Sequence, residues 1–227
     1  MTRETAGKGA ASKPAVEEQR GAVRRSGRAR NPRGQGGRLR EELVESAARL
    51  LRASTAGDGV SLGAIAREAG IATPSFYRHF PDKDALVREV IERTFRDFTD
   101  ALQQAADSAR EEPPRALLAA VVQAWWTYAV ANHGDYMLMF GYDAAPPVDT
   151  PADYPGFLPW GPVEEALEAC DRAGLLRLDR PTALGLLLSS LHGRILFWEH
   201  LPFQGDAETL RRFADVVLDA VLAPSGA

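Results

Sequence analysis

Side chains able to contact nucleic acid gather between residues 72 and 83 of this 227-residue chain. Ser75, Tyr77, Arg78 and His79 offer hydroxyl, guanidinium and imidazole groups within roughly two helical turns. Such groups near the N-terminus of a helix suit the base edges in a DNA major groove. The candidate DNA contacts of this stretch are Ala72, Thr73, Pro74, Ser75, Tyr77, Arg78, His79 and Lys83. A packing corner of three helices, with its polar residues in water, is the alternative interpretation.

Two short helices joined by a tight turn are needed to position these side chains. Gly70 can adopt the left-handed conformation that ends the first helix. Thr73 is the predicted N-cap of the second helix, with Pro74 at its first helical position. Phe76 and Phe80, four residues apart, can anchor the face opposite the polar groups. The buried face of the first helix is predicted to be Leu62, Ile65, Ala66 and Ala69. This geometry is a helix-turn-helix.

The run SLGAIAREAGIATPSFYRHFPDKDAL resembles the DNA-binding signature of TetR-type bacterial transcription regulators. The shared positions are Ile65, Ala66, Gly70, Tyr77, His79, Phe80, Lys83 and Leu86. The chain departs from the family at Thr73 and Pro74, where a basic or polar residue and then Gly are usual, and at Arg78, often a second Tyr. These departures lie at base-reading positions. The resemblance implies that Lys83 meets a DNA phosphate, and a solvated surface lysine is the alternative.

Positive charge is concentrated at the N-terminus. Residues 1–40 hold nine Arg and two Lys against three Glu, a net charge of +8, whereas the remainder carries −12 and the whole chain −4. Residues 20–40 include eight Arg and no acidic residue, interspersed with Gly, Ser, Asn and Pro. We expect 1–37 to be a disordered basic arm that contacts DNA, with Arg33 and Arg38 as candidate contacts. A solubilising tail is the alternative, but the position before a helix-turn-helix favours DNA.

Composition indicates a protein of the reducing cytoplasm. The chain is 45% hydrophobic and 26% charged, and its polar N-terminus lacks the apolar core of a secretory signal. The most apolar run, 116–131, is too short to span a membrane. Cys170 is the single cysteine, so no intrachain disulfide is possible. The histidines lack metal-ligand spacing, and no phosphate loop or nucleophile elbow is present, so we expect no enzyme, metal or cofactor.

Apolar periodicity and Pro or Gly breaks predict an all-α chain. A helix is expected at 38–53, before the helix-turn-helix, and it forms a three-helix head at 38–85 together with the two helices of that motif. A long helix follows at 82–110, with Asp82 as its predicted N-cap and an apolar stripe of Leu86, Val90, Phe95, Phe98 and Leu102. Residues 86–227 are expected to form a C-terminal helical domain, with helices at 115–132, 136–140, 162–173, 181–200 and 206–222. His133, Gly134 and Asp135 are predicted to break the first two apart. The helix at 162–173 is predicted to end at Gly174 and to turn Val163, Ala166, Leu167 and Cys170 inward. The Pro-rich segment 141–161 is predicted to be a long loop.

Aromatic and Met residues of the C-terminal domain are candidates for a ligand pocket. The principal candidates are Trp125, Trp126, Tyr128, Met137, Phe140, Phe157, Trp160 and His192, and Tyr142, Phe197 and Trp198 are further candidates. Such residues at helical spacing are more often core, and His192 inside an apolar helix is more often a hydrogen-bonded core residue. As a set, with repackable Met side chains and a Pro-rich loop, they could enclose an apolar small molecule.

The resemblance implies a homodimeric regulator that pairs through its last two helices. Two reading helices related by a two-fold axis address a palindromic operator of double-stranded DNA. We expect a repressor that a small, largely apolar effector releases from DNA, with no membrane partner. The alternative is a helical ligand-binding protein without specific operator binding, whose basic arm serves another partner.

Overall fold

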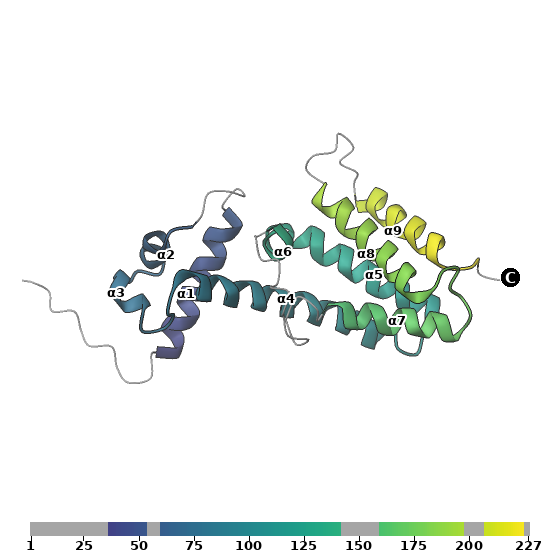
Figure 1. The fold of residues 1–227 in the computed structure, drawn as a ribbon, viewed down its shortest axis with the longest axis horizontal. Helices are drawn as coiled ribbons and strands as arrows, with labels where there is room; N and C mark the ends of the chain where they lie inside the picture. The colour runs from purple at the N-terminus through teal and green to yellow at the C-terminus, as the bar shows by residue number, and fades with distance from the viewer. Residues whose placement is uncertain (1–35, 54–59, 142–158, 198–206, 225–227) are drawn as a thin grey trace, which may run out of the picture. The chain divides into compact units, whose positions relative to one another are not determined.

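A computed structural model describes residues 36–53, 60–141, 159–197 and 207–224 of the chain. Within these ranges all regular structure is helical, apart from an isolated β-bridge between Leu176 and Leu222. The helices, shown in Figure 1, are α1 (Gly36–Ala53), α2 (Leu62–Glu68), α3 (Thr73–Phe76), α4 (Lys83–Ser108), α5 (Pro114–Ala131), α6 (His133–Gly141), α7 (Trp160–Arg172), α8 (Arg180–Leu196) and α9 (Ala207–Val221). The predicted all-α class is confirmed.

Side-chain caps begin several helices where the sequence changes from turn to helix. The Asp82 carboxylate accepts from the Ala85 N–H at 2.7 Å, as predicted for the start of α4. Asp179 caps α8 in the same way, accepting from the Thr182 N–H at 3.0 Å. Gly174 ends α7 with φ of 66°, also as predicted.

The break between α5 and α6 is shorter than predicted. We expected His133, Gly134 and Asp135 to interrupt the chain and a helix to start at Tyr136, but α6 starts at His133. Asn132 alone makes the break. Its backbone N–H donates to the Tyr128 carbonyl at 2.8 Å, and its carbonyl accepts from the Tyr136 N–H at 2.9 Å. One residue therefore closes α5 and opens α6, which leaves no room for a loop.

Helices α4 and α5 form the centre of the fold. α4 packs on α1 near its start and on α5, α6 and α7 further along, while α5 also contacts α8 and α9 (Figure 1). The apolar stripe predicted for α4 is buried: Leu86, Val90, Phe95, Phe98 and Leu102. The apolar stripe predicted for α7 is also buried: Val163, Ala166, Leu167 and Cys170. None of the described helices is long and apolar enough to cross a membrane.

Several predictions concern positions outside the described residues. They are the basic arm with Arg33, the segment 142–158 with Tyr142 and Phe157, and the expected end of the eighth helix at 198–200 with Trp198.

Candidate nucleic-acid interface

The turn between α2 and α3 is closed by backbone hydrogen bonds around Gly70. Ser61 caps α2 by accepting from the Ala64 N–H at 3.1 Å. At the other end, the Ile71 N–H donates to the Ala66 carbonyl at 2.8 Å and the Gly70 N–H donates to the Arg67 carbonyl at 3.0 Å. This pattern requires a left-handed residue, and Gly70 has φ of 64°. The predicted role of Gly70 is therefore confirmed.

α3 begins one residue earlier than the predicted cap allows. Ala72 is the N-cap, with φ of −81° and ψ of 140°, and its carbonyl accepts from the Ser75 N–H at 2.8 Å. The prediction that Thr73 caps the helix is wrong, because Thr73 is itself the first helical residue. Its exposed side chain makes no capping bond. α3 ends at Phe76, and a turn continues to Phe80 through the His79 N–H, which donates to the Phe76 carbonyl at 2.8 Å.

Two buried rings hold this segment, which we call the reading turn (Ala72–Phe80), against the head. Phe76 is 0% and Phe80 3% exposed, and their ring centroids lie 5.8 Å apart. Both are therefore the anchors that their spacing predicted. The Tyr77 ring meets Phe76 edge-on at 5.5 Å yet remains 58% exposed. A large exposed aromatic side chain on an otherwise polar turn is available to a partner.

The predicted DNA contacts of the reading turn lie together on the head. Ala72, Thr73, Pro74, Tyr77 and Arg78 are exposed, and Ser75 and His79 are partly exposed. Lys83 is the first residue of α4, directly after the Asp82 cap, and is partly exposed. Arg38 lies at the start of α1, with a side chain 80% exposed and an ion pair to Glu42 at 3.0 Å.

An aromatic cluster joins helices α4 to α8 in the C-terminal half. Phe98 of α4 contacts the Trp125, Tyr128 and Tyr136 rings at centroid distances of 5.5, 5.1 and 5.9 Å. Phe140 contacts Trp160 at 6.4 Å and His192 at 4.5 Å. The structure thus brings together the predicted pocket residues Trp125, Tyr128, Phe140, Trp160 and His192.

The remaining predicted pocket residues lie elsewhere or have no described contact. Trp126 stacks on Phe213 of α9 at a centroid distance of 6.4 Å, on a different side of α5 from Trp125. Met137 is partly buried on α6. Phe197 follows α8 and is 59% exposed.

A buried hydrogen-bonded chain runs through the cluster. The Trp125 Nε1–H donates to the Tyr136 hydroxyl at 3.2 Å, and that hydroxyl lies 2.9 Å from His192 Nδ1. Because an indole N–H can only donate, the Tyr136 oxygen accepts from it and its own O–H is left to donate to Nδ1. This arrangement satisfies both buried donors when His192 is neutral with its proton on Nε2.

Burial keeps this chain uncharged. It lowers the pKa of His192 and raises the pKa of Tyr136, since both charged forms lose hydration in apolar surroundings. Sequence reasoning missed Tyr136 and Phe98 as members of the site. The position of Tyr136 one helical turn before Phe140, and of Phe98 three residues after Phe95, is the signal that was available.

α6 connects this cluster to the head. Asp135, next to Tyr136 in the chain, forms an ion pair with Arg52 in the last turn of α1. A Cβ at Gly134 would lie 3.5 Å from the Arg52 side chain, so the two helices are in van der Waals contact there. The first turn of α6 thus contacts α1 through one residue and the aromatic cluster through the next.

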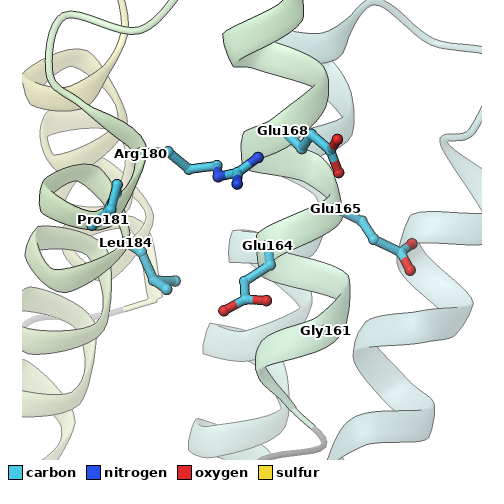
Figure 2. Close-up of a pocket in the computed structure, with 7 residues that line it drawn as sticks. All are labelled: Gly161, Glu164, Glu165, Glu168, Arg180, Pro181 and Leu184. Carbon is cyan, nitrogen blue, oxygen red and sulfur yellow. The ribbon is translucent and has the colours of Figure 1, made fainter.

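A surface groove of about 450 Å³ lies between α7 and α8. Figure 2 shows the Arg180 side chain extending from α8 toward α7, whereas the Glu165 carboxylate points away from α8. The lining residues are Gly161, Glu164, Glu165, Glu168, Arg180, Pro181 and Leu184. None of them belongs to the aromatic cluster. Among the described residues, no group of three or more His, Cys, Asp or Glu side chains could hold a metal ion.

A glycine-terminated turn, a short second helix anchored by two rings and an exposed polar face define a helix-turn-helix DNA-binding domain. Residues 43–90 match the family profile described as "Bacterial regulatory proteins, tetR family". Residues 43–90 therefore carry a helix-turn-helix head of the type that defines this family, as the sequence resemblance predicted.

Known proteins agree with this assignment. An uncharacterised helix-turn-helix transcriptional regulator of Haemophilus influenzae is 40% identical over 68 residues, which are 30% of this chain and 33% of that protein. The matched region therefore spans about a third of this relative.

Solved structures share the fold over most of the chain. A Rhodococcus sp. RHA1 protein of unknown function is 25% identical with a TM-score of 0.69, over 86% of this chain and 100% of its own. A TetR-family regulator from Haemophilus influenzae is 20% identical with a TM-score of 0.61, over 84% of this chain and 100% of its own. RolR, in complex with its ligand resorcinol, is 21% identical with a TM-score of 0.54, over 84% of this chain and 91% of its own.

Proposed function

We propose that the chain is a homodimeric repressor that binds a palindromic operator and is released by a small, largely apolar effector. The exposed polar face of the reading turn, fixed by the buried Phe76 and Phe80 rings, is the observation that carries the proposal. In this proposal residues 38–85 bind DNA, 86–227 bind the effector and the second subunit, and the arm 1–37 adds phosphate contacts.

The proposed DNA contacts in and around the reading turn divide into two roles. Ser75 lies near the N-terminus of α3, where base edges are read, so it is assigned to sequence discrimination. Tyr77, with its exposed ring and hydroxyl, and Lys83, at the start of α4, are assigned to the DNA backbone. Ala72, Thr73, Pro74, Arg78 and His79 complete the contact face, and Arg33 and Arg38 extend it.

Exposed apolar side chains on the last helices support pairing of two subunits. Leu186 of α8 is 37% exposed and Val216 of α9 is 64% exposed, although the same helices bury Leu187, Leu191, Val217 and Leu218. Large exposed apolar side chains on adjacent helices favour a protein interface. A dimer formed there by two copies of α8 and α9 gives the two-fold axis that a palindromic operator requires.

The aromatic cluster is the proposed effector site, with Trp125, Tyr128, Phe140, Trp160 and His192 as its described lining. Met137 and Phe157 are further members of the proposed set, whereas Trp126 faces α9. The ring edges and faces suit an apolar or aromatic molecule. The resorcinol held by RolR, which shares the fold, is an aromatic ligand of this kind.

Release requires that the effector shift the population of two states of the protein. Two routes connect the cluster to the head. α4 carries Phe98 of the cluster and begins beside the reading turn, and α6 carries Tyr136 of the cluster and the Arg52–Asp135 ion pair. An effector that displaces Tyr136 would therefore move the contact between α6 and α1.

Selection of bound fragments from the source genome tests the proposal. We expect a palindromic site whose affinity falls steeply with salt, because arginine and lysine contacts displace counterions from DNA. Tyr77→Phe and Lys83→Ala should weaken binding to all sequences alike, whereas Ser75→Ala should change which sequence is preferred. Failure to select any specific site would favour the alternative, a helical ligand-binding protein whose basic arm serves another partner.

Resorcinol and other small neutral aromatic molecules then test release and the site. We expect an active compound to quench the fluorescence of Trp160 and to dissociate the operator complex, and Trp160→Phe to lose the quenching. Val216→Glu should produce monomers in analytical ultracentrifugation and weaken operator binding. A dimer that survives this change would contradict the proposed interface.

A further inference from the structure

Two ion pairs of opposite polarity hold α1 against α4. Both guanidinium Nη atoms of Arg40 donate to the two carboxylate oxygens of Glu89, and Arg93 donates to Glu41 at 2.5 Å. On α1 the cation Arg40 is followed directly by the anion Glu41. On α4 their partners, Glu89 and Arg93, lie one helical turn apart. The Glu89 side chain is only 24% and the Arg40 side chain 43% exposed. A two-pronged, partly buried pair of this kind fixes direction as well as distance.

Arg40 also contacts the reading turn. Its guanidinium carbon lies 4.7 Å from the centroid of the Phe80 ring, in the geometry of a cation–π contact. Phe80 is the last residue of the reading turn and packs on Phe76. Arg40 therefore joins helix α1, helix α4 and the reading turn through one side chain.

These contacts separate Arg40 from the other arginines of the basic run. By sequence Arg40 is the last member of the series that we expected to neutralise phosphates. In the structure its donors are directed at Glu89 and its guanidinium carbon lies over the Phe80 ring, whereas the Arg38 side chain is 80% exposed. A guanidinium used in this way is not available for phosphate without giving up both contacts.

We propose that Arg40 is a positioning residue that sets the orientation of the reading turn on α4 and thereby the sequence discrimination of the head. This inference rests on the DNA-binding function proposed above. Lysine keeps the charge of arginine but cannot make the two-pronged hydrogen bond to Glu89. Arg40→Lys therefore removes the contact that positions the reading turn while it keeps the positive charge.

The first experiment compares binding to the selected operator and to a scrambled duplex over a series of salt concentrations. Arg40→Lys and Glu89→Gln should each reduce the ratio of specific to non-specific affinity by about 10-fold, as the loss of a partly buried charged contact implies. The salt dependence of non-specific binding should be unchanged for Arg40→Lys. Arg96→Lys, an exposed arginine of α4 outside the proposed DNA contacts, is the matched control and should leave the ratio intact.

A phosphate role for Arg40 gives the opposite pattern. Arg40→Lys would then preserve the ratio, and Arg40→Gln would lower the salt slope by about 1 on both duplexes. That result would overturn the inference. Absence of any specific site for the wild-type chain would instead count against the proposed function, before any variant is compared.

Amide hydrogen exchange tests the positioning role without DNA. The His79 and Phe80 amides bond to the Phe76 carbonyl at 2.8 and 3.1 Å and report on the reading turn. Arg40→Lys should accelerate their exchange by about 10-fold relative to Arg96→Lys, while amides of α5 exchange as before. Unchanged exchange at His79 and Phe80 would refute the inference whatever the DNA result. Glu89→Gln serves as the second variant if Arg40→Lys lowers global stability.

Discussion

Replacing Tyr136 with Phe removes one oxygen from the hydrogen-bonded chain in the aromatic cluster and leaves the ring in place. Trp125 is 0% exposed, so its Nε1–H loses its partner at 3.2 Å with no route to water. A buried unsatisfied donor costs about 1 to 3 kcal/mol. His192 is only partly buried and can rehydrate, so loss of its bond adds about 1 kcal/mol.

The expected loss of unfolding free energy is therefore about 2 to 4 kcal/mol, or a fall in Tm of roughly 6 to 12 °C for a chain of this length. Urea titration and calorimetry measure it, at one protein concentration because subunit pairing contributes to stability. Tyr128→Phe is the matched control. Tyr128 is a partly buried tyrosine that also contacts Phe98, but no residue in the described part of the chain hydrogen bonds its hydroxyl.

The control should change stability by less than about 0.5 kcal/mol. Equal losses for Tyr136→Phe and Tyr128→Phe would refute the argument, since the cost would then come from general burial of a hydroxyl. A double-mutant cycle with Trp125→Phe isolates the bond, and the second change should cost less once the first has removed its partner.

Three further predictions concern the turn, a helix cap and a buried histidine. Gly70→Ala should cost about 1 to 2 kcal/mol in urea unfolding, because φ of 64° strains any residue with a Cβ, although no atom lies within 4 Å. The control Gly63→Ala lies inside α2 and should leave stability equal or higher. Asp82→Ala should cost about 1 kcal/mol and Asp82→Asn much less, because asparagine retains the cap at Ala85 N–H. Burial lowers the pKa of His192 in the folded state, so the unfolded chain binds the imidazole proton more tightly. The free energy of unfolding should therefore be full above about pH 6.5 and fall as the pH drops toward the lowered pKa of the folded state. In His192→Gln, the urea midpoints measured between about pH 5 and 8 should depend less on pH.

The order of helices could be predicted from the sequence because apolar spacing and chain breaks are local. Gly70, Asp82 and Gly174 take the predicted conformations or caps, since each acts on its own backbone within three residues. The errors lie where two local rules compete. Thr73 and Ala72 could each precede a helix, and the choice depends on where the turn after Gly70 directs the backbone.

Contacts between distant segments could not be predicted in the same way. Arg40 and Glu89, or Tyr136 and His192, lie 49 and 56 residues apart, so no local periodicity relates them. The aromatic residues of the C-terminal domain were recognised by type, but the division between Trp125 and Trp126 depends on which side of α5 faces α4 and which faces α9. That orientation is set by the packing of the whole domain.

α1 is held near both of its ends, by Arg40 to α4 and by Arg52 to α6. The two arginines are 12 positions apart, or about 18 Å along the helix axis. This spacing bears on the construction of hybrid regulators, in which the head of one protein is joined to the effector domain of another. Transplanting residues 38–85 alone would leave both arginines without their acids, because Glu89 and Asp135 stay behind. A working chimera requires carboxylates at those two places in the recipient.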